Sequence, residues 1–567
     1  MRRWGIVAAV VAIMSSLLVI DARAEESASQ DPLCGANDLP EGEALNGKPT
    51  PQLQGDVPKA HQDGENADGL TRAEAGYNCG LELVAREVLD ADGRKPTGNA
   101  NMAWASHCAY VSGAGTVFGP AEYDPATDDP NGLAVIDVHD PADPKHVRTL
   151  KNEATTQVLE TIYAIDARDT PGGPITHSIL VVGVYGNNTG PGELSGNDLM
   201  HVYDVTGNKC EHPKRVGEFT FPENIHNLTI SGNGRYVFAT SPNQVLSIEG
   251  LFDHDPRTGM RFLGNLDEVT DYPLVGISPV ADLDDLAPPA RKTPADYTAH
   301  QVWSNFDGNL LYMGGTVKPF EVFTILDITD WLRDGTKPTV VSQRNGRGHS
   351  VTKTSIAGQG EWVMHAEESV FDLAYGCFGE EGAPFAGVAE PSFSNVTDPA
   401  NPTMHVSKFS LDINKQENCV AQMASGVQAS THYHEFDSSE NAKIAIVSMQ
   451  NAGIRVVDVR DPTKPREIAY FNPGDVDDGP GVTLDNAWGH PKFDAKSGTI
   501  WFATSSGGFW VVRLEKQVLE ALGMSVLDGA SETGAPGTLL AGSSNVAFPA
   551  AEPPPVWCTL SVPLSKL

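Results

Sequence analysis

The stretch Asn131-Gly-Leu-Ala-Val-Ile-Asp-Val-His-Asp-Pro-Ala-Asp-Pro144 reads as a short apolar strand followed by a turn that holds two prolines. The same pattern returns much later in the chain as Ala452-Gly-Ile-Arg-Val-Val-Asp-Val-Arg-Asp-Pro-Thr-Lys-Pro465. Proline fixes φ and has no N–H to donate, so it belongs in the turn and not in the ladder of a sheet. Partial copies occur at three further places: Val202–Val205, Thr324–Ile328 and Ser394–Pro402.

Copied strand-and-turn units of this kind predict the fold class. Repeats of about 40 to 75 residues with three or four strands each are typical of β-propeller blades. A β-sandwich has strands at similar spacing, but it does not copy one unit along the chain. The sequence therefore predicts an all-β protein, a β-propeller with an N-terminal arm and a C-terminal tail.

A second repeated element predicts the number of blades. A histidine, a turn that usually contains glycine about eight residues later, and an apolar strand recur at His107, His226, His300, His349, His434 and His490. The segment 160–222 has the strands but no histidine at that place. We therefore expect seven blades, starting near residues 101, 160, 224, 298, 347, 430 and 486. The seventh blade lacks an outer strand of its own, and Leu81–Leu89 can supply that strand.

The repeated Val-Ile-Asp-Val-x-Asp-Pro-x-x-Pro unit resembles the LVIVD-repeat family of secreted β-propellers. The resemblance covers roughly residues 100 to 517 and is strongest at 131–150 and 430–473. It implies the propeller fold. Because these repeats are structural, the resemblance implies little about activity.

The first residues have the features of an export signal. Arg2 and Arg3 precede an apolar run from Gly5 to Ile20, and Ala22–Ala24 offers small residues where a signal peptidase reads them. The run is shorter than the roughly 20 apolar residues that a membrane span needs. We expect residues 1–24 to be a signal peptide and the mature protein to be secreted or periplasmic. An uncleaved N-terminal anchor is the alternative.

The remaining boundaries follow from composition. We expect an acidic extended arm at 25–79, the propeller at 80–517 and a C-terminal tail at 518–567. The chain has seven cysteines and no C-x-x-C pair, which argues against a zinc ribbon and favours disulfides in an oxidising compartment. Proximity suggests the pairs Cys34–Cys79 and Cys377–Cys419, although spacing does not fix connectivity. The odd number leaves at least one thiol free or intermolecular.

The six repeated histidines are the candidate metal ligands. The innermost strand of a blade lines the central axis, so histidines at its start converge on one mouth of the channel. Neutral imidazole suits Cu, Zn and Fe, and an open coordination position allows redox or Lewis-acid chemistry. We therefore expect a transition metal (Cu, Fe, Mn or Zn) at His107, His226, His300, His349, His434 and His490. The competing interpretation is structural, because repeats copy a residue that only caps a turn.

Two further histidines and three acidic runs are secondary candidates. His432 lies two residues before His434, and His365 is close to Glu367 and Glu368. Calcium favours oxygen ligands, so it is a second and weaker candidate metal, at the acidic runs 124–129, 282–285 and 475–478. None of these runs has the spacing of an EF-hand loop.

Charge limits the partners of the protein. Lys+Arg 39 against Asp+Glu 74 gives a formal charge of -35, which a nucleic acid or an anionic membrane would repel. No Gly-x-Ser-x-Gly elbow, P-loop or dinucleotide fingerprint is present. We therefore expect a metal-binding propeller, in one interpretation an oxidoreductase acting on a small molecule. The alternatives are a metal-free module that binds an extracellular protein or glycan, and a calcium-stabilised scaffold.

Overall fold

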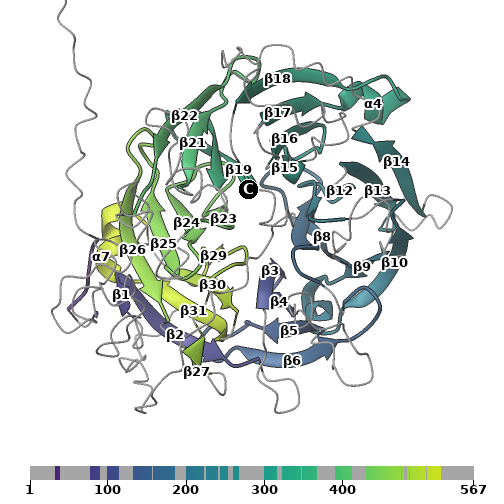
Figure 1. Cartoon of the computed structure of the whole chain (residues 1–567). Coiled ribbons are helices and arrows are strands. Elements are labelled where there is room, and N and C mark those ends of the chain that lie inside the picture. Colours follow the sequence, from purple (N-terminus) through teal and green to yellow (C-terminus); the bar gives the residue numbers. More distant parts are fainter. Residues whose placement is uncertain are drawn as a thin grey trace, which may run out of the picture.

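The structure is a computed structural model, and it shows seven β-sheets arranged as blades around a central axis (Figure 1). Each blade is an antiparallel sheet of four strands, except that the sixth has five. The predicted seven-bladed, all-β propeller is therefore confirmed. The structure describes residues 32–36, 38, 77–89, 99–113, 132–155, 158–184, 199–222, 225–240, 243–252, 259–266, 299–315, 322–345, 348–366, 390–411, 430–473, 476–477, 482–483, 486–505 and 507–524.

We number the blades 1 to 7 by their innermost strands, which contact one another around the axis. These strands are β3 (Asn99–Ala105), β7 (Ile162–Arg168), β11 (Leu228–Ile230), β15 (Ala299–Ser304), β19 (Ser350–Ile356), β23 (His434–Phe436) and β29 (Lys492–Asp494). The second strands are β4 (Cys108–Gly113), β8 (Ile175–Gly183), β12 (Tyr236–Ala239), β16 (Leu310–Gly315), β20 (Gly360–Ala366), β24 (Ile444–Ser448) and β30 (Thr499–Thr504).

The repeated unit of the sequence forms the third strand of a blade and the turn that follows it. The third strands are β5 (Leu133–Asp137), β9 (Leu199–Asp204), β13 (Gln244–Gly250), β17 (Val322–Asp327), β21 (Ser392–Asn395), β25 (Ile454–Asp458) and β31 (Gly508–Leu514). All five residues of β25 are buried. Neighbouring blades cover both faces of such a strand, so even its polar Arg455 is buried, where it pairs with Glu467 at 3.2 Å.

The outer strands face solvent and are more polar. They are β6 (Lys145–Leu150), β10 (Lys214–Thr220), β14 (Gly259–Asn265), β18 (Thr339–Asn345), β22 (Thr403–Lys408), β26 (Arg466–Asn472) and β2 (Leu81–Glu87). Shorter elements complete the chain: β1 (Tyr77–Cys79), β27 (Val476–Asp477), β28 (Val482–Thr483), the 3-10 helix η1 (Gly207–Glu211), α4 (Thr329–Asp334) and α7 (Lys516–Leu522). No helix in the described ranges is long and apolar enough to cross a membrane.

The N-terminal part of the chain closes the ring. Strand β2 pairs antiparallel with β31, so it is the outer strand of blade 7, as the sequence predicted. Strand β1, which the sequence analysis did not foresee, pairs with β26 and adds the fifth strand to blade 6. The two strands are separated by Gly80, whose φ is +66°. One short segment therefore joins two neighbouring blades.

Two disulfides are present in the described residues. Cys34–Cys79 confirms one predicted pair and fixes the arm beside β1. Cys108–Cys210 was not predicted; it joins the start of β4 in blade 1 to η1 in blade 2. The predicted pair Cys377–Cys419 lies outside the described residues.

The arm and α7 meet at two carboxylates, Asp38 and Glu515. Burial and the neighbouring Asp38 raise the pKa of Glu515 from 4.5 to about 7. The folded protein then binds this proton more tightly than the unfolded chain, so stability falls as the pH rises through 4.5 to 7 and stays lowered above that window.

We therefore expect Glu515→Gln to raise the melting temperature relative to the native chain, and to raise it more at pH 8 than at pH 5. Thermal unfolding at both pH values measures the difference. Glu520→Gln changes an exposed carboxylate on the same helix and is the control. An equal gain in melting temperature for Glu515→Gln at both pH values would contradict the raised pKa of Glu515 in the folded protein.

Candidate metal centre

A single buried carboxylate lies at the mouth of the axis. Glu160 lies two residues before the start of β7, and its side chain is 1% exposed. Its Oε2 lies 3.5 Å from Nε2 of His226 and 3.3 Å from Nε2 of His300. Its Oε1 lies 3.4 Å from Nε2 of His432. One carboxylate therefore contacts three imidazoles.

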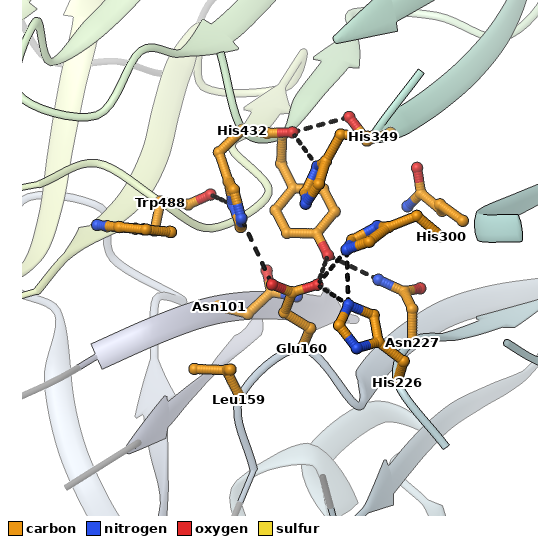
Figure 2. Close-up of polar contacts among 12 residues, drawn as sticks. Asn101, Leu159, Glu160, His226, Asn227, His300, His349, His432 and Trp488 are labelled. Carbon is orange, nitrogen blue, oxygen red and sulfur yellow. Dashed lines mark hydrogen bonds and ion pairs between the residues drawn. The ribbon is translucent and has the colours of Figure 1, made fainter. Parts of the chain in front are cut away.

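A fourth imidazole completes the group. Ring nitrogens of His349 and His432 and an oxygen of Glu160 lie within 4.8 Å of one another. Figure 2 shows the four imidazoles around the carboxylate. We call Glu160, His226, His300, His349 and His432 the axial cluster. Its members come from blades 2, 3, 4, 5 and 6 in order, so five successive blades contribute one side chain each.

The repeated backbone geometry explains this convergence. The N–H groups of three cluster histidines each donate to the residue at the end of the second strand: His226 to Thr240 O, His349 to Ala366 O and His432 to Ser448 O. The three histidines therefore occupy equivalent positions in their blades. His300 lies at an irregularity between β15 and β16, where the pairing shifts between Ala299 and Gln301. Such bulges re-aim side chains near functional sites.

Backbone carbonyls fix the rings of two of these histidines. Nδ1 of His349 lies 3.2 Å from the carbonyl oxygen of His432. Nδ1 of His432 lies 2.8 Å from the carbonyl oxygen of Trp488. A carbonyl only accepts, so each Nδ1 carries the hydrogen and, in the neutral ring, Nε2 keeps its lone pair. This is the arrangement by which proteins orient histidine ligands.

The charges in the cluster favour a bound cation. Burial alone would raise the pKa of Glu160, but contacts with His300, His432 and His226 outweigh it and hold the pKa well below its usual range. Burial lowers the pKa of His300 and of His349 well below the ordinary value, and neighbouring imidazoles add to the effect. The low pKa of His300 and His349 favours neutral rings, so the carboxylate needs a cation beside it, a protonated neighbouring imidazole or a metal ion, to stay ionised.

Two members of the cluster are less covered than the others. The His226 side chain is 12% exposed and that of His300 is 7% exposed, whereas Glu160 and His432 are 1% exposed. Nε2 of His226 lies 2.6 Å from Nε2 of His300. The cluster is therefore buried, and its least covered side is that of the His226 ring.

Two linked hydrogen bonds through Tyr433 hold the carboxylate of Glu160 in place. The Tyr433 hydroxyl donates to Oε2 of Glu160 at 2.8 Å and accepts from Nδ2 of Asn227 at 2.6 Å. Tyr433 is fully buried and stacks on the ring of His490, with ring centroids 4.0 Å apart. The carboxylate is thus held in one orientation by a rigid, buried neighbour.

The structure brings together three of the six predicted histidines: His226, His300 and His349. His434 and His490 lie beside the cluster without joining it. Nδ1 of His434 is 3.2 Å from Ser350 Oγ, and Nε2 of His490 is 3.2 Å from Gln301 Nε2. Burial lowers the pKa of both to about 3, so both rings are neutral neighbours of the cluster.

The position predicted for His107 needs correction. It was expected at the start of an innermost strand, but Ala105 pairs with Cys108, so His107 lies in the turn that ends β3. The two ends of an innermost strand lie at opposite faces of a propeller. His107 is therefore on the face away from the axial cluster, where its Nε2 lies 3.3 Å from Glu211 Oε1.

Sequence reasoning missed Glu160 and ranked His432 second. Glu160 lies at the start of the innermost strand in the one blade that had no histidine there, and this gap was the available signal. His432 was passed over because His434 matched the distance to the following turn. The backbone pairing of blade 6 makes His432 the equivalent of His226.

The other secondary candidates do not join the cluster. His365 is buried in β20, with Nε2 3.0 Å from Ser394 Oγ, and packs against Phe323. Glu367, Glu368 and the acidic runs at 124–129 and 282–285 lie outside the described residues. So do 475 and 478 of the third run, and only the backbone of 476–477 is described.

Comparison with known proteins identifies no family for this chain. No family model matches the chain, and no curated protein matches it. It is similar to the β-propeller domain of Cps50 (Swd1) from Myceliophteria thermophila, with 10% identity, 77% of this chain and 100% of that chain covered, and a TM-score of 0.43. A chain of the Mitotic Checkpoint Complex has 9% identity, covers 76% of this chain and 91% of its own, with a TM-score of 0.39.

Proposed function

We propose that the axial cluster binds one divalent transition-metal ion through Glu160, His226, His300, His349 and His432. The observation that carries this proposal is the convergence of four imidazoles from four blades on one buried carboxylate. Imidazole and carboxylate together suit first-row metals such as Fe, Mn, Cu and Zn.

The contact between His432 and Glu160 supports a cation at the centre. Nδ1 of His432 donates to Trp488 O, so a neutral His432 ring would turn the lone pair of Nε2 toward Oε1 of Glu160, which lies 3.4 Å away. Two acceptors at this distance repel, so a proton or a metal ion belongs near them. A proton satisfies one such contact, whereas a metal ion accepts lone pairs from several rings and the carboxylate at once.

The least covered side of the cluster supports a reactive role for the metal. Catalytic metal sites keep a position for water or substrate, whereas structural sites are closed. The partial exposure of the His226 ring supports such a position on that side of the cluster. We infer an LVIVD-type propeller that uses its metal in oxidoreductase chemistry on a small molecule.

Elemental analysis of the purified chain, without a His tag or chelator, tests this proposal. At the axial cluster we expect close to one equivalent of Fe, Mn, Cu or Zn, or uptake of one equivalent there after incubation with one of these ions. We expect His300→Ala to lose that equivalent, because it removes a ring nitrogen 3.3 Å from the carboxylate. His201→Ala removes a buried imidazole of β9 that is not part of the cluster and should leave the metal content unchanged.

The outcomes separate the parts of the proposal. Equal metal content in the native chain and in folded His300→Ala, checked by circular dichroism, would reject the axial site. Failure to bind any of the four ions would point to a metal-free binding module. Binding of Zn alone would keep the site but reject the redox chemistry, since Zn²⁺ has no redox chemistry.

We further propose that the protein is exported after cleavage near residue 24. The two disulfides support an oxidising compartment, because disulfides are rare where thiols are kept reduced. The N-terminal sequence of the protein recovered from the exported fraction tests this. A chain that keeps Arg2 and Arg3 would argue for the anchored alternative.

A further inference from the structure

We propose a second metal site, independent of the axial cluster, that bridges blades 1 and 2 on the opposite face of the propeller. Its ligands are His107 in the β3–β4 turn, Asp137 at the end of β5 and Glu211 at the end of η1. One ring nitrogen and two carboxylate oxygens of these residues lie within 4.8 Å of one another. We call them the bridging trio.

The ligand atoms are close enough for a single ion. Nε2 of His107 lies 3.3 Å from Glu211 Oε1 and 3.9 Å from Asp137 Oδ1. The three side chains are 22%, 31% and 25% exposed, in the order His107, Glu211, Asp137. They are thus partly shielded from water and still reachable by an ion. The nearby Lys145 pairs directly with Asp143 at 2.9 Å and interacts with Asp137 of the trio through its charge.

A disulfide and two hydrogen bonds fix the backbone around the trio. The disulfide joins Cys108 to Cys210, and these are the sequence neighbours of His107 and Glu211. The carbonyl of His107 accepts from Val138 N at 2.8 Å, and Asp137 Oδ1 accepts from His139 N at 2.8 Å. Ligands from two blades are therefore held in register before any ion binds, which lowers the entropy cost of binding.

The chemistry of the trio selects the kind of ion. One imidazole and two carboxylates suit Zn²⁺, which binds His nitrogen and Asp or Glu oxygen, with water in the remaining position. With a neutral histidine the trio carries two negative charges, and the whole chain carries -35, so a divalent cation is attracted. The bound ion would connect the two blades beside the disulfide.

Zinc stoichiometry by equilibrium dialysis at micromolar Zn²⁺, without reductant, tests this site. We expect His107→Asn and Glu211→Gln each to bind one equivalent fewer than the native chain. His139→Asn is the control, because His139 is exposed and its ring lies 5.3 Å from that of His107. We expect His139→Asn to bind as the native chain does.

The difference in zinc stoichiometry between the native chain and each variant distinguishes the bridging trio from the axial cluster. If the axial cluster binds no zinc, the native chain binds one equivalent and His107→Asn binds none. If His107→Asn and Glu211→Gln bind as much zinc as the native chain, the bridging trio is only a set of ion pairs and the proposal is overturned. Loss of the same equivalent in His139→Asn would also overturn it, since binding would then not depend on the trio.

Discussion

Replacing Glu160 by glutamine is expected to weaken the affinity of the axial cluster for its metal by about 100-fold or more. Mutation of a residue that only hydrogen-bonds to a metal ligand already lowers metal affinity by about 10- to 100-fold, and Glu160 is proposed as a ligand itself. Glutamine keeps the size of the side chain and can still accept from Tyr433, whose hydroxyl donates to Glu160 Oε2 at 2.8 Å. It removes the negative charge that contacts three imidazoles. The variant therefore tests the charge and not the packing.

Two measurements check this prediction. Metal affinity is measured by competition with a chromophoric chelator, and thermal unfolding is measured with and without metal. A 100-fold weaker affinity at saturating metal corresponds to a loss of about 2.7 kcal/mol of metal-dependent stabilisation. If Glu160→Gln is instead destabilised equally with and without metal, the carboxylate is the counter-ion of a protonated histidine and not a ligand.

The second large effect is expected at Gly80, where the chain passes from blade 6 to blade 7. A Cβ there would lie 2.7 Å from Val518 Cγ2 and 2.9 Å from the carbonyl oxygen of Leu33. We expect Gly80→Ala to cost about 1–2 kcal/mol for the left-handed backbone and about 1–3 kcal/mol more for overpacking. Urea unfolding measures the sum.

Gly172 offers a matched control. Its φ is also +66°, but a Cβ there would meet no atom within 4 Å. Gly172→Ala should therefore show the backbone cost alone. Equal destabilisation of the two variants would mean that the packing of Val518 and Leu33 around Gly80 does not limit the closure of the ring.

The fold was predictable because the sequence of this propeller repeats the same strand-and-turn unit several times. The copies at 131–144 and 452–465 became the third strands β5 and β25 with their following turns. The expected closing strand at Leu81–Leu89 is β2, and the Cys34–Cys79 pair is present. For the copied strands a local pattern was enough, because neighbouring blades impose the same surroundings on each copy.

The site was predictable only in part, because it depends on how positions align between blades. Histidines are rare enough in this chain for their repetition to be visible, whereas Glu160 is one acidic residue among 74. His432 and His434 could be ranked only by the pairing of His432 with Ser448. The place of His107 depended on the pairing of Ala105 with Cys108, which spacing alone did not fix.

The closure of the ring by β2 also sets the order in which the protein can fold. Arg513 bonds to Glu82, which lies 431 residues earlier in the chain, so a strand made among the first must wait for one made among the last. Until β31 is synthesised, blade 7 is incomplete. The edges of β2 and β30 that β31 pairs with are then open to pairing with other chains. Contacts of such long separation slow folding. A chain interrupted before residue 508 would therefore keep its earlier blades but expose the edges that a complete ring covers.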